Sequence, residues 1–297
     1  MTKSRALVWI VIAYIVAMFV GGASLYFFNH NPLLDIFIAD IVATLVIFGF
    51  SRWFSNSSFY DAYWSVIPPL IALYWMAHTS IEPPPIRVLL MMGLILYWAT
   101  RLTLNWAVHW HGMEHEDWRY VMLKQNNPRA AFFIDLAGIH LFPTFQVFAG
   151  MLPVYAVLCL STAAFNCLDL VATAVTFGAI TLQMLSDFQL HAFNDSKQPG
   201  ECIRSGLWGW SRHPNYFGEI GFWFGLFLFG LAAAPQEWYW IGTGFVAMTL
   251  MFLFASIPMM EKRSLQRRPQ YQAVIDSVSM LIPLPPKRDR QHASTAR

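Results

Sequence analysis

Long apolar runs alternate with short polar segments along almost the whole chain. Most of these runs reach the length of about 20 residues that a helix needs to cross the hydrocarbon core of a bilayer. They cover residues 6–28, 34–54, 64–81, 87–108, 131–160, 168–193, 216–234 and 238–260. The pattern predicts an all-α fold, a polytopic transmembrane helical bundle with about eight spans. Seven spans are the alternative, if one of the runs is re-entrant.

The composition agrees with an integral membrane protein. Hydrophobic residues make up 57% of the chain and charged residues only 12%, as is typical of membrane proteins. The net charge of +2 is too small to indicate nucleic-acid binding. The first run follows Lys3 and Arg5, as in a signal peptide, but it is long enough to be a spanning helix. We expect a single membrane domain over residues 1–297, with a disordered polar tail at 284–297.

Basic residues are concentrated in every second connection between the predicted spans. Both termini and the connections near 119–129 and 197–212 carry several bases. The connections at 29–33, around Asn166 and around Pro235 carry none, and the one near residue 82 carries only Arg87. Lys and Arg are enriched in cytoplasmic loops, so this alternation predicts that both termini are cytoplasmic.

The run Arg204–Glu219 holds the densest set of chemically capable side chains in the sequence. Guanidinium groups bind phosphate in a bidentate way, aromatic rings offer stacking faces, and amide or carboxylate groups can bond ribose hydroxyls. The run offers all of these: Arg204, Trp208, Arg212, His213, Asn215, Tyr216 and Glu219. The sequence has neither a Gly-x-Gly-x-x-Gly motif nor a Walker lysine, so a nucleotide would bind without those folds. A solvated loop with an interfacial Trp and Arg belt is the alternative.

Polar side chains inside the predicted spans are costly and therefore mark candidate sites. Gln183, Asp187, His191 and Asn194 recur on one face of the sixth span, which leads into the arginine-rich run. His140 and Thr144 form a shorter pair in the fifth. For each residue, a packed and hydrogen-bonded helix contact is the alternative interpretation.

The motifs Gly206-Leu-Trp208 and Ser211-Arg-His-Pro-Asn-Tyr-Phe-Gly-Glu219 resemble the signature of membrane reductases of the steroid 5-alpha-reductase and sterol-reductase kind. The closest likeness is to an uncharacterised bacterial branch with a steroid 5-alpha-reductase-like C-terminal domain, which implies a bacterial inner membrane. The resemblance covers about 182–283, with looser matches over 58–143. It implies that the half 168–283 binds NADPH. The residues implied in that role are Asp187, Lys197, Arg204, Trp208, Arg212, His213, Asn215, Tyr216 and Glu219.

Two features of this resemblance leave alternatives open. The isoprenylcysteine carboxyl methyltransferases share an Arg-His-Pro-x-Tyr core but bind S-adenosylmethionine. Asn215 before the tyrosine, and the Gly-Glu pair after it, favour the reductases. A difference in spacing after the sixth span leaves both Lys197 and Asn194 as candidates for the family's basic contact.

The segment His109–Tyr120 contains three histidines, and two of them, His111 and His115, have the i, i+4 spacing of metal ligands on a helix. The other histidines are scattered singly, so we expect no metal site. The segment also carries acids, and we expect it to fold over the arginine-rich run with its acids paired against those bases. The stretch Ser58–Trp64 offers a possible phenol–carboxylate pair, for which an interfacial aromatic belt is the alternative.

Together with these residues, the resemblance implies an NADPH-dependent reductase of an activated, enone-like carbon–carbon double bond in a lipophilic substrate such as a steroid or an isoprenoid. The alternatives are methyl transfer from S-adenosylmethionine to a lipid or prenyl-cysteine carboxylate, and a non-catalytic lipid-binding protein. The carbonyl of an enone needs a hydrogen-bond donor. We favour Asp61 with Tyr63 for this role, and the alternative is Tyr120 with Glu116 or Asp117. The expected partners are the bilayer and a lipophilic small molecule.

Overall fold

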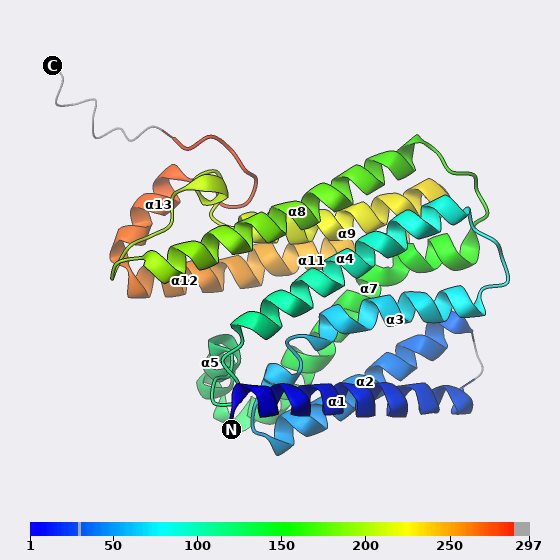
Figure 1. Cartoon of the computed structure of the whole chain (residues 1–297), viewed down its shortest axis with the longest axis horizontal. Coiled ribbons are helices and arrows are strands. Elements are labelled where there is room, and N and C mark those ends of the chain that lie inside the picture. Colours follow the sequence, from blue (N-terminus) through cyan, green and yellow to red (C-terminus); the bar gives the residue numbers. More distant parts are fainter. Residues whose placement is uncertain (29–30, 288–297) are drawn as a thin grey trace. The chain divides into compact units, whose positions relative to one another are not determined.

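The computed structural model describes residues 1–28 and 31–287, and within these ranges the secondary structure is helical, without strands (Figure 1). The predicted all-α class is therefore confirmed. Most of the expected disordered tail, residues 288–297, lies outside the described residues.

The chain forms two compact units, which we describe separately. Unit 1 comprises Met1–Asp169 and Leu226–Gly244, and unit 2 comprises Leu170–Gly225 and the chain from Phe245 onward. The chain passes between the units within helices α8 (Cys167–Ser196), α9 (Pro214–Ala233) and α11 (Thr243–Met251).

Unit 1 contains most of the predicted spans. Its elements are α1 (Lys3–Ser24), η1 (Leu25–Phe27), α2 (Pro32–Trp53), η2 (Ser57–Phe59), α3 (Tyr63–His78), α4 (Pro85–His109), α5 (Trp118–Asn126), η3 (Pro128–Ala130), α6 (Ala131–Phe133), η4 (Ile134–Leu141), α7 (Phe142–Tyr155), η5 (Ala156–Leu160), η7 (Pro235–Glu237) and α10 (Trp238–Ile241). Local sequence sets where these helices begin. At α2, for example, the Asn31 side chain accepts a hydrogen bond from Leu34 N at 2.9 Å, and Pro32 fills the first position, where no N–H is needed.

Within residues 1–28 and 31–287, seven helical segments are long and apolar enough to cross a membrane, so the protein has the features of a multi-pass membrane protein. They are Lys3–Phe27, Pro32–Trp53, Pro85–His109, Pro128–Leu160, Cys167–Ser196, Pro214–Ala233 and Pro235–Arg267. The remaining predicted span, 64–81, forms α3, which has only 16 residues. At 1.5 Å per residue, α3 is about 24 Å long, shorter than a hydrocarbon core of about 30 Å.

Helix α3 nevertheless runs from one end of unit 1 to the other. The helix α1 starts beside the end of α4, where Lys3 Nζ donates to Val108 O at 2.6 Å. The segment just before α3 lies at that same end, because Asn56 Nδ2 donates to Met113 O at 2.9 Å. After α3, Thr79 Oγ1 donates to Leu158 O at 2.6 Å, at the end of η5. Thus α3 is antiparallel to its neighbours α2 and α4 and is not a re-entrant hairpin (Figure 1).

A buried ion pair ties together the opposite end of unit 1. Arg87 Nε donates to Asp169 Oδ1 at 2.7 Å, and both side chains are fully buried. The same guanidinium donates from Nη1 to Ala163 O at 2.7 Å. Arg87 was the single base predicted for this side of the membrane. Its charge is compensated by Asp169, so this end presents no exposed positive charge from Arg87.

Unit 2 places the arginine-rich run between a long helix and a C-terminal helical segment. Its other elements are η6 (Gly206–Gly209), η8 (Phe252–Ser256), α12 (Ile257–Arg267), η9 (Pro269–Tyr271) and α13 (Gln272–Ser277). Helices α8 and α9 pack closely because glycines face α8. A Cβ on Gly225 would lie 2.0 Å from Thr176 Oγ1, and one on Gly218 would lie 2.8 Å from Ala179 O. This close packing fixes the start of α9, and with it the segment that precedes it.

Candidate functional site

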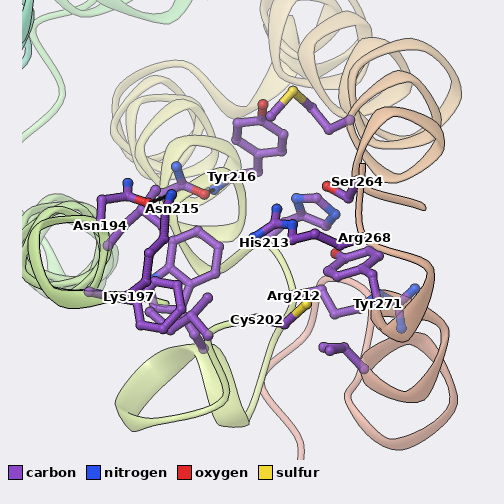
Figure 2. A pocket seen from close by; sticks show the side chains of 16 residues that line it. Asn194, Lys197, Cys202, Arg212, His213, Asn215, Tyr216, Ser264, Arg268 and Tyr271 are labelled. Atoms are coloured by element: carbon purple, nitrogen blue, oxygen red, sulfur yellow. Dashed lines mark hydrogen bonds between the residues drawn. The ribbon is translucent and has the colours of Figure 1, made fainter. Parts of the chain in front are cut away.

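A cavity of about 180 Å³ in unit 2 collects most of the residues predicted to bind a cofactor (Figure 2). Six of the nine predicted residues line it: Lys197, Trp208, Arg212, His213, Asn215 and Tyr216. Figure 2 shows Asn194 and Lys197 on one wall, Ser264, Arg268 and Tyr271 on the opposite wall, and His213 between them. The end of α8, the segment before α9, and α12 with η9 therefore supply the walls.

The segment before α9 is held against α8 by hydrogen bonds. The Trp208 indole N–H donates to Ser186 O at 3.0 Å, and Leu207 N donates to the Gln189 side chain at 2.9 Å. Gly206 adopts φ +58, and a Cβ there would lie 2.5 Å from the Gln189 side-chain oxygen. Glycine is therefore required at this position, because another residue would displace the contact that fixes η6.

The Arg212 guanidinium is hydrogen-bonded to other groups of the protein, whereas the sequence predicts that it binds a phosphate. Its Nε donates to Glu261 Oε1 at 2.6 Å and its Nη1 donates to Ile275 O at 3.0 Å. The backbone N–H of Arg212 donates to Ser279 O at 2.8 Å. A guanidinium that is almost completely buried needs such partners. Arg212 still lines the cavity, but it chiefly joins the segment before α9 to the C-terminal segment.

His213 and Tyr216 form an aromatic wall. Their rings stack at 5.3 Å with an interplanar angle of 10°, and Tyr216 also packs on Phe252 at 4.6 Å. The Nε2 atom of His213 lies 3.2 Å from Glu261 Oε1, so the same carboxylate orients both His213 and Arg212. The stacked pair is one turn apart on and before α9, as Pro214 begins the helix.

Three of the nine predicted residues do not line the cavity. Asp187 stands behind Asn215, whose Nδ2 donates to Asp187 Oδ1 at 3.4 Å. Glu219 is buried and accepts a hydrogen bond from the Trp223 indole N–H at 2.9 Å, one turn along α9. Arg204 is exposed and belongs to neither cavity of this region. The sequence pattern does not show which way these three side chains point.

The wall formed by α12 and η9 was not predicted as part of the site. Ser264, Arg268 and Tyr271 line the cavity from this side. Burial raises the pKa of the Tyr271 phenol to about 12, so it stays a neutral hydrogen-bonding group. A signal was present in the sequence, because Glu261, Ser264 and Arg268 follow at i, i+3 and i+7 and so share one helix face.

A basic cleft of about 360 Å³ adjoins the cavity, and Lys197 and Arg268 line both. Arg267 and the turn Gln198–Glu201 complete the cleft. The turn is ordered by Gln198 N, which donates to Glu201 Oε2 at 2.9 Å, and by Arg268 Nη1, which donates to Glu201 O at 3.1 Å. Lys197 Nζ donates to Asn194 Oδ1 at 2.6 Å, so the two alternative candidates for a basic contact lie together.

In unit 1, the phenols of Tyr63 and Tyr120 have carboxylate partners other than the predicted ones. The Tyr63 hydroxyl donates to Asp40 Oδ1 at 2.9 Å, not to Asp61. Asp61 instead accepts from the Tyr120 hydroxyl at 2.8 Å. The reason is the direction of each element: Tyr63 opens α3 and turns toward α2, whereas Asp61 precedes α3 and faces α5. Burial raises the pKa of the Asp61 carboxyl to about 6, and the Tyr120 hydrogen bond opposes part of this rise.

Two acids of the segment before α5, Glu116 and Asp117, have partners within unit 1. Glu116 accepts from Lys124 Nζ at 2.6 Å and from Ser57 N at 2.8 Å. Asp117 caps α5 and pairs with Arg119 at 2.8 Å. These bases are only two and eight residues along the chain, so they are the nearest partners.

The predicted pair His140 and Thr144 belongs to a buried hydrogen-bond network. His140 Nε2 lies 2.9 Å from Ser51 Oγ. Thr144 Oγ1 lies 2.9 Å from Thr44 Oγ1 and 2.8 Å from the Tyr60 hydroxyl. Both residues therefore join α2 to η4 and α7 through satisfied polar contacts, which matches the packed-helix alternative.

Asp40 is a buried acid that sequence reasoning missed. It is 2% exposed, and among the described residues its Oδ2 atom has no hydrogen-bond partner. It lines an otherwise apolar cavity of about 110 Å³ between α1, α2 and α3, together with Gly21, Ala43 and Ile67. An isolated acid within an apolar run is a site candidate, because an ionisable side chain is energetically costly inside a membrane span. This feature of the sequence could have identified Asp40.

Comparisons with known proteins place the chain in a family. It belongs to the proteins of unknown function DUF1295, whose family model matches residues 47–278. An uncharacterised protein of Schizosaccharomyces pombe is 25% identical over 282 residues, which cover 87% of this chain and 81% of that protein. No solved structure matches the chain. The matched family region includes every residue that lines the unit 2 cavity, whereas Asp40 precedes it.

Proposed function

We propose that this membrane protein is an NADPH-dependent reductase of an activated, enone-like carbon–carbon double bond in a lipophilic substrate. The observation that carries the proposal is the unit 2 cavity, which is lined by six of the nine residues that the resemblance implies for cofactor binding. Their types suit a nucleotide: a stacked aromatic pair, an amide and a lysine.

The residues present fit a dinucleotide in two parts. A cavity of about 180 Å³ is smaller than typical small-molecule sites of about 300–1,000 Å³. The adjoining cleft of about 360 Å³ continues it past Lys197 and Arg268. We assign Tyr216 and His213 to ring stacking and Asn215 to polar contacts with the cofactor. Lys197 and Arg268 would hold phosphate.

The bound cofactor would supply a hydride to the β carbon, while the α carbon takes a proton and the double bond becomes a single bond. The chain must then stabilise the negative charge that develops on the carbonyl oxygen. We assign this role to the Tyr63 hydroxyl, with Asp40 as the residue that positions it. A neutral phenol is a suitable donor.

Methyl transfer from S-adenosylmethionine is the second candidate, because that class shares the Arg-His-Pro-x-Tyr core. The basic cleft favours NADPH over this cofactor. S-adenosylmethionine carries a sulfonium cation and a single carboxylate but no phosphate, so it matches a site edged by three bases less well than NADPH does.

The test uses the full-length protein purified in detergent. Mass spectrometry of co-purifying nucleotides and titration with NADPH, NADH and S-adenosylmethionine should detect NADPH binding. Asn215→Leu should weaken that binding by about tenfold or more, because it leaves buried polar groups without a partner. Arg204→Gln is the matched control, since Arg204 is exposed and outside the cavity, and it should bind as the wild type does. Binding of S-adenosylmethionine alone, or of neither cofactor, would contradict the proposal.

A further inference from the structure

We infer that the basic cleft of Lys197, Arg267 and Arg268 is a phosphomonoester site that takes the 2′-phosphate of NADPH and so selects NADPH over NADH. This inference rests on the proposed function. It assigns the phosphate to residues outside the Arg204–Glu219 run, two of which sequence reasoning did not consider.

The charge of the cleft suits a phosphate monoester. Among its seven lining residues, three are cationic and one, Glu201, is anionic, which leaves a net charge of +2. The Glu201 carboxylate is already engaged, because its Oε2 accepts from Gln198 N at 2.9 Å within the turn. A phosphate monoester carries about −1.5 to −2 charges at pH 7, so the two charges match.

The two arginines of the sequence motif are poorly placed for this role. Arg212 is almost completely buried, with Nε bonded to Glu261 and Nη1 bonded to Ile275 O. Arg204 lines neither the cavity nor the cleft. Arg267, by contrast, is exposed and lines the cleft, where a guanidinium can meet a phosphate in a bidentate way.

The position of the cleft supports the assignment to a 2′-phosphate. Lys197 and Arg268 line both the cavity and the cleft, so the two spaces meet between these side chains. A ribose at this boundary would place its base on the cavity side and its 2′-phosphate on the cleft side. The turn Gln198–Glu201 is held by Arg268 and Gln270, which bond Glu201 O and Gly200 O, so the cleft is a built feature of the fold.

The experiment measures NADPH and NADH binding to the full-length protein in detergent. Arg267→Gln should weaken NADPH by about tenfold to a hundredfold, the loss expected for one charge-assisted contact. NADH binding should change less than about twofold. Arg268→Lys gives a second reading that keeps the charge, and it should weaken NADPH less than Arg267→Gln does. Lys262→Gln is the matched control, because Lys262 is exposed on α12 and lines neither space.

The outcomes separate this inference from the proposed function. Suppose that the wild type binds NADPH, and that Arg267→Gln weakens the binding of NADPH and NADH equally or leaves both unchanged. The inference is then overturned and the proposed function stands. If the wild type binds neither nucleotide, the function itself fails. The headgroup of phosphatidic acid is also a phosphate monoester. If Arg267→Gln lowers retention of phosphatidic acid in nanodiscs and leaves the ratio of NADPH affinity to NADH affinity unchanged, the cleft is a lipid site and the inference is wrong.

Discussion

Glu261 controls the geometry of the unit 2 site, because one of its carboxylate oxygens contacts both Arg212 and His213. Removing a charged partner leaves the other partner unsatisfied at a cost of about 1.5–3 kcal/mol. Glu261→Gln and Arg212→Ala should therefore each lower the thermal unfolding temperature in detergent and weaken NADPH and NADH together. Unfolding monitored by intrinsic tryptophan fluorescence checks the first effect, and titration checks the second. A selective loss of NADPH in Arg212→Ala, with unchanged stability, would restore Arg212 as the phosphate ligand.

The residues of this site also show what a sequence can and cannot specify. The segment Arg204–Glu219 was identified from its residue types, and Pro214 marked the start of α9. The partner of Arg212 lies 49 residues later in the chain. Whether a guanidinium faces a ligand or a carboxylate of its own protein depends on how α12 packs, which no local pattern encodes. The same limit explains Tyr63, whose partner Asp40 lies 23 residues away in another apolar run.

At the scale of elements, the contact between α2 and α3 distinguishes two phenols that look equivalent in the sequence. Tyr63 and Tyr120 each donate to a carboxylate, but only Tyr63 contacts the acid that lines an apolar cavity. Tyr63→Phe removes one hydroxyl, and loss of one oxyanion donor costs about 10²–10³ in kcat. With a hydrophobic cyclic enone as the probe and NADPH absorbance as the readout, kcat should fall by about that factor.

Binding of NADPH should change by less than about twofold in Tyr63→Phe, because the lost interaction is made only in the transition state. Tyr120→Phe is the matched control and should keep kcat within about threefold of the wild type. If Tyr120→Phe loses activity and Tyr63→Phe does not, the role belongs to the Tyr120–Asp61 pair.

The helices themselves could be predicted from the sequence because their apolar runs are continuous. The short helix α3 is the exception, because only its contacts in the structure show that it runs from one end of unit 1 to the other.

At the scale of the whole molecule, the two ends of unit 1 differ in charge, and this difference predicts the orientation in the membrane. Lys3 and Val108 lie at one end. The first turn of α1 carries Arg5, and the segment after α4 carries Arg119 and Lys124. Thr79 and Leu158 lie at the other end, where Arg87 is the single base among the described residues of unit 1. Because bases are enriched on the cytoplasmic side, we propose that the first end faces the cytoplasm of a bacterium.

Reporter fusions test this orientation along the chain. Fusions after Arg129, after Glu201 and at the C-terminus should report the cytoplasm, and fusions near Asn166 and Pro235 should report the periplasm. Helix α8 begins just after Asn166, and its 30 residues extend about 45 Å, so the two ends of this helix should lie on opposite sides. A water-soluble nucleotide such as NADPH is available in the cytoplasm, so the cavity at the end of α8 requires a cytoplasmic Glu201. A periplasmic signal at Glu201 would therefore contradict both the topology of eight crossings and the cofactor site. A reversed signal at Pro235 alone would contradict only the predicted location of the connection between α9 and α11.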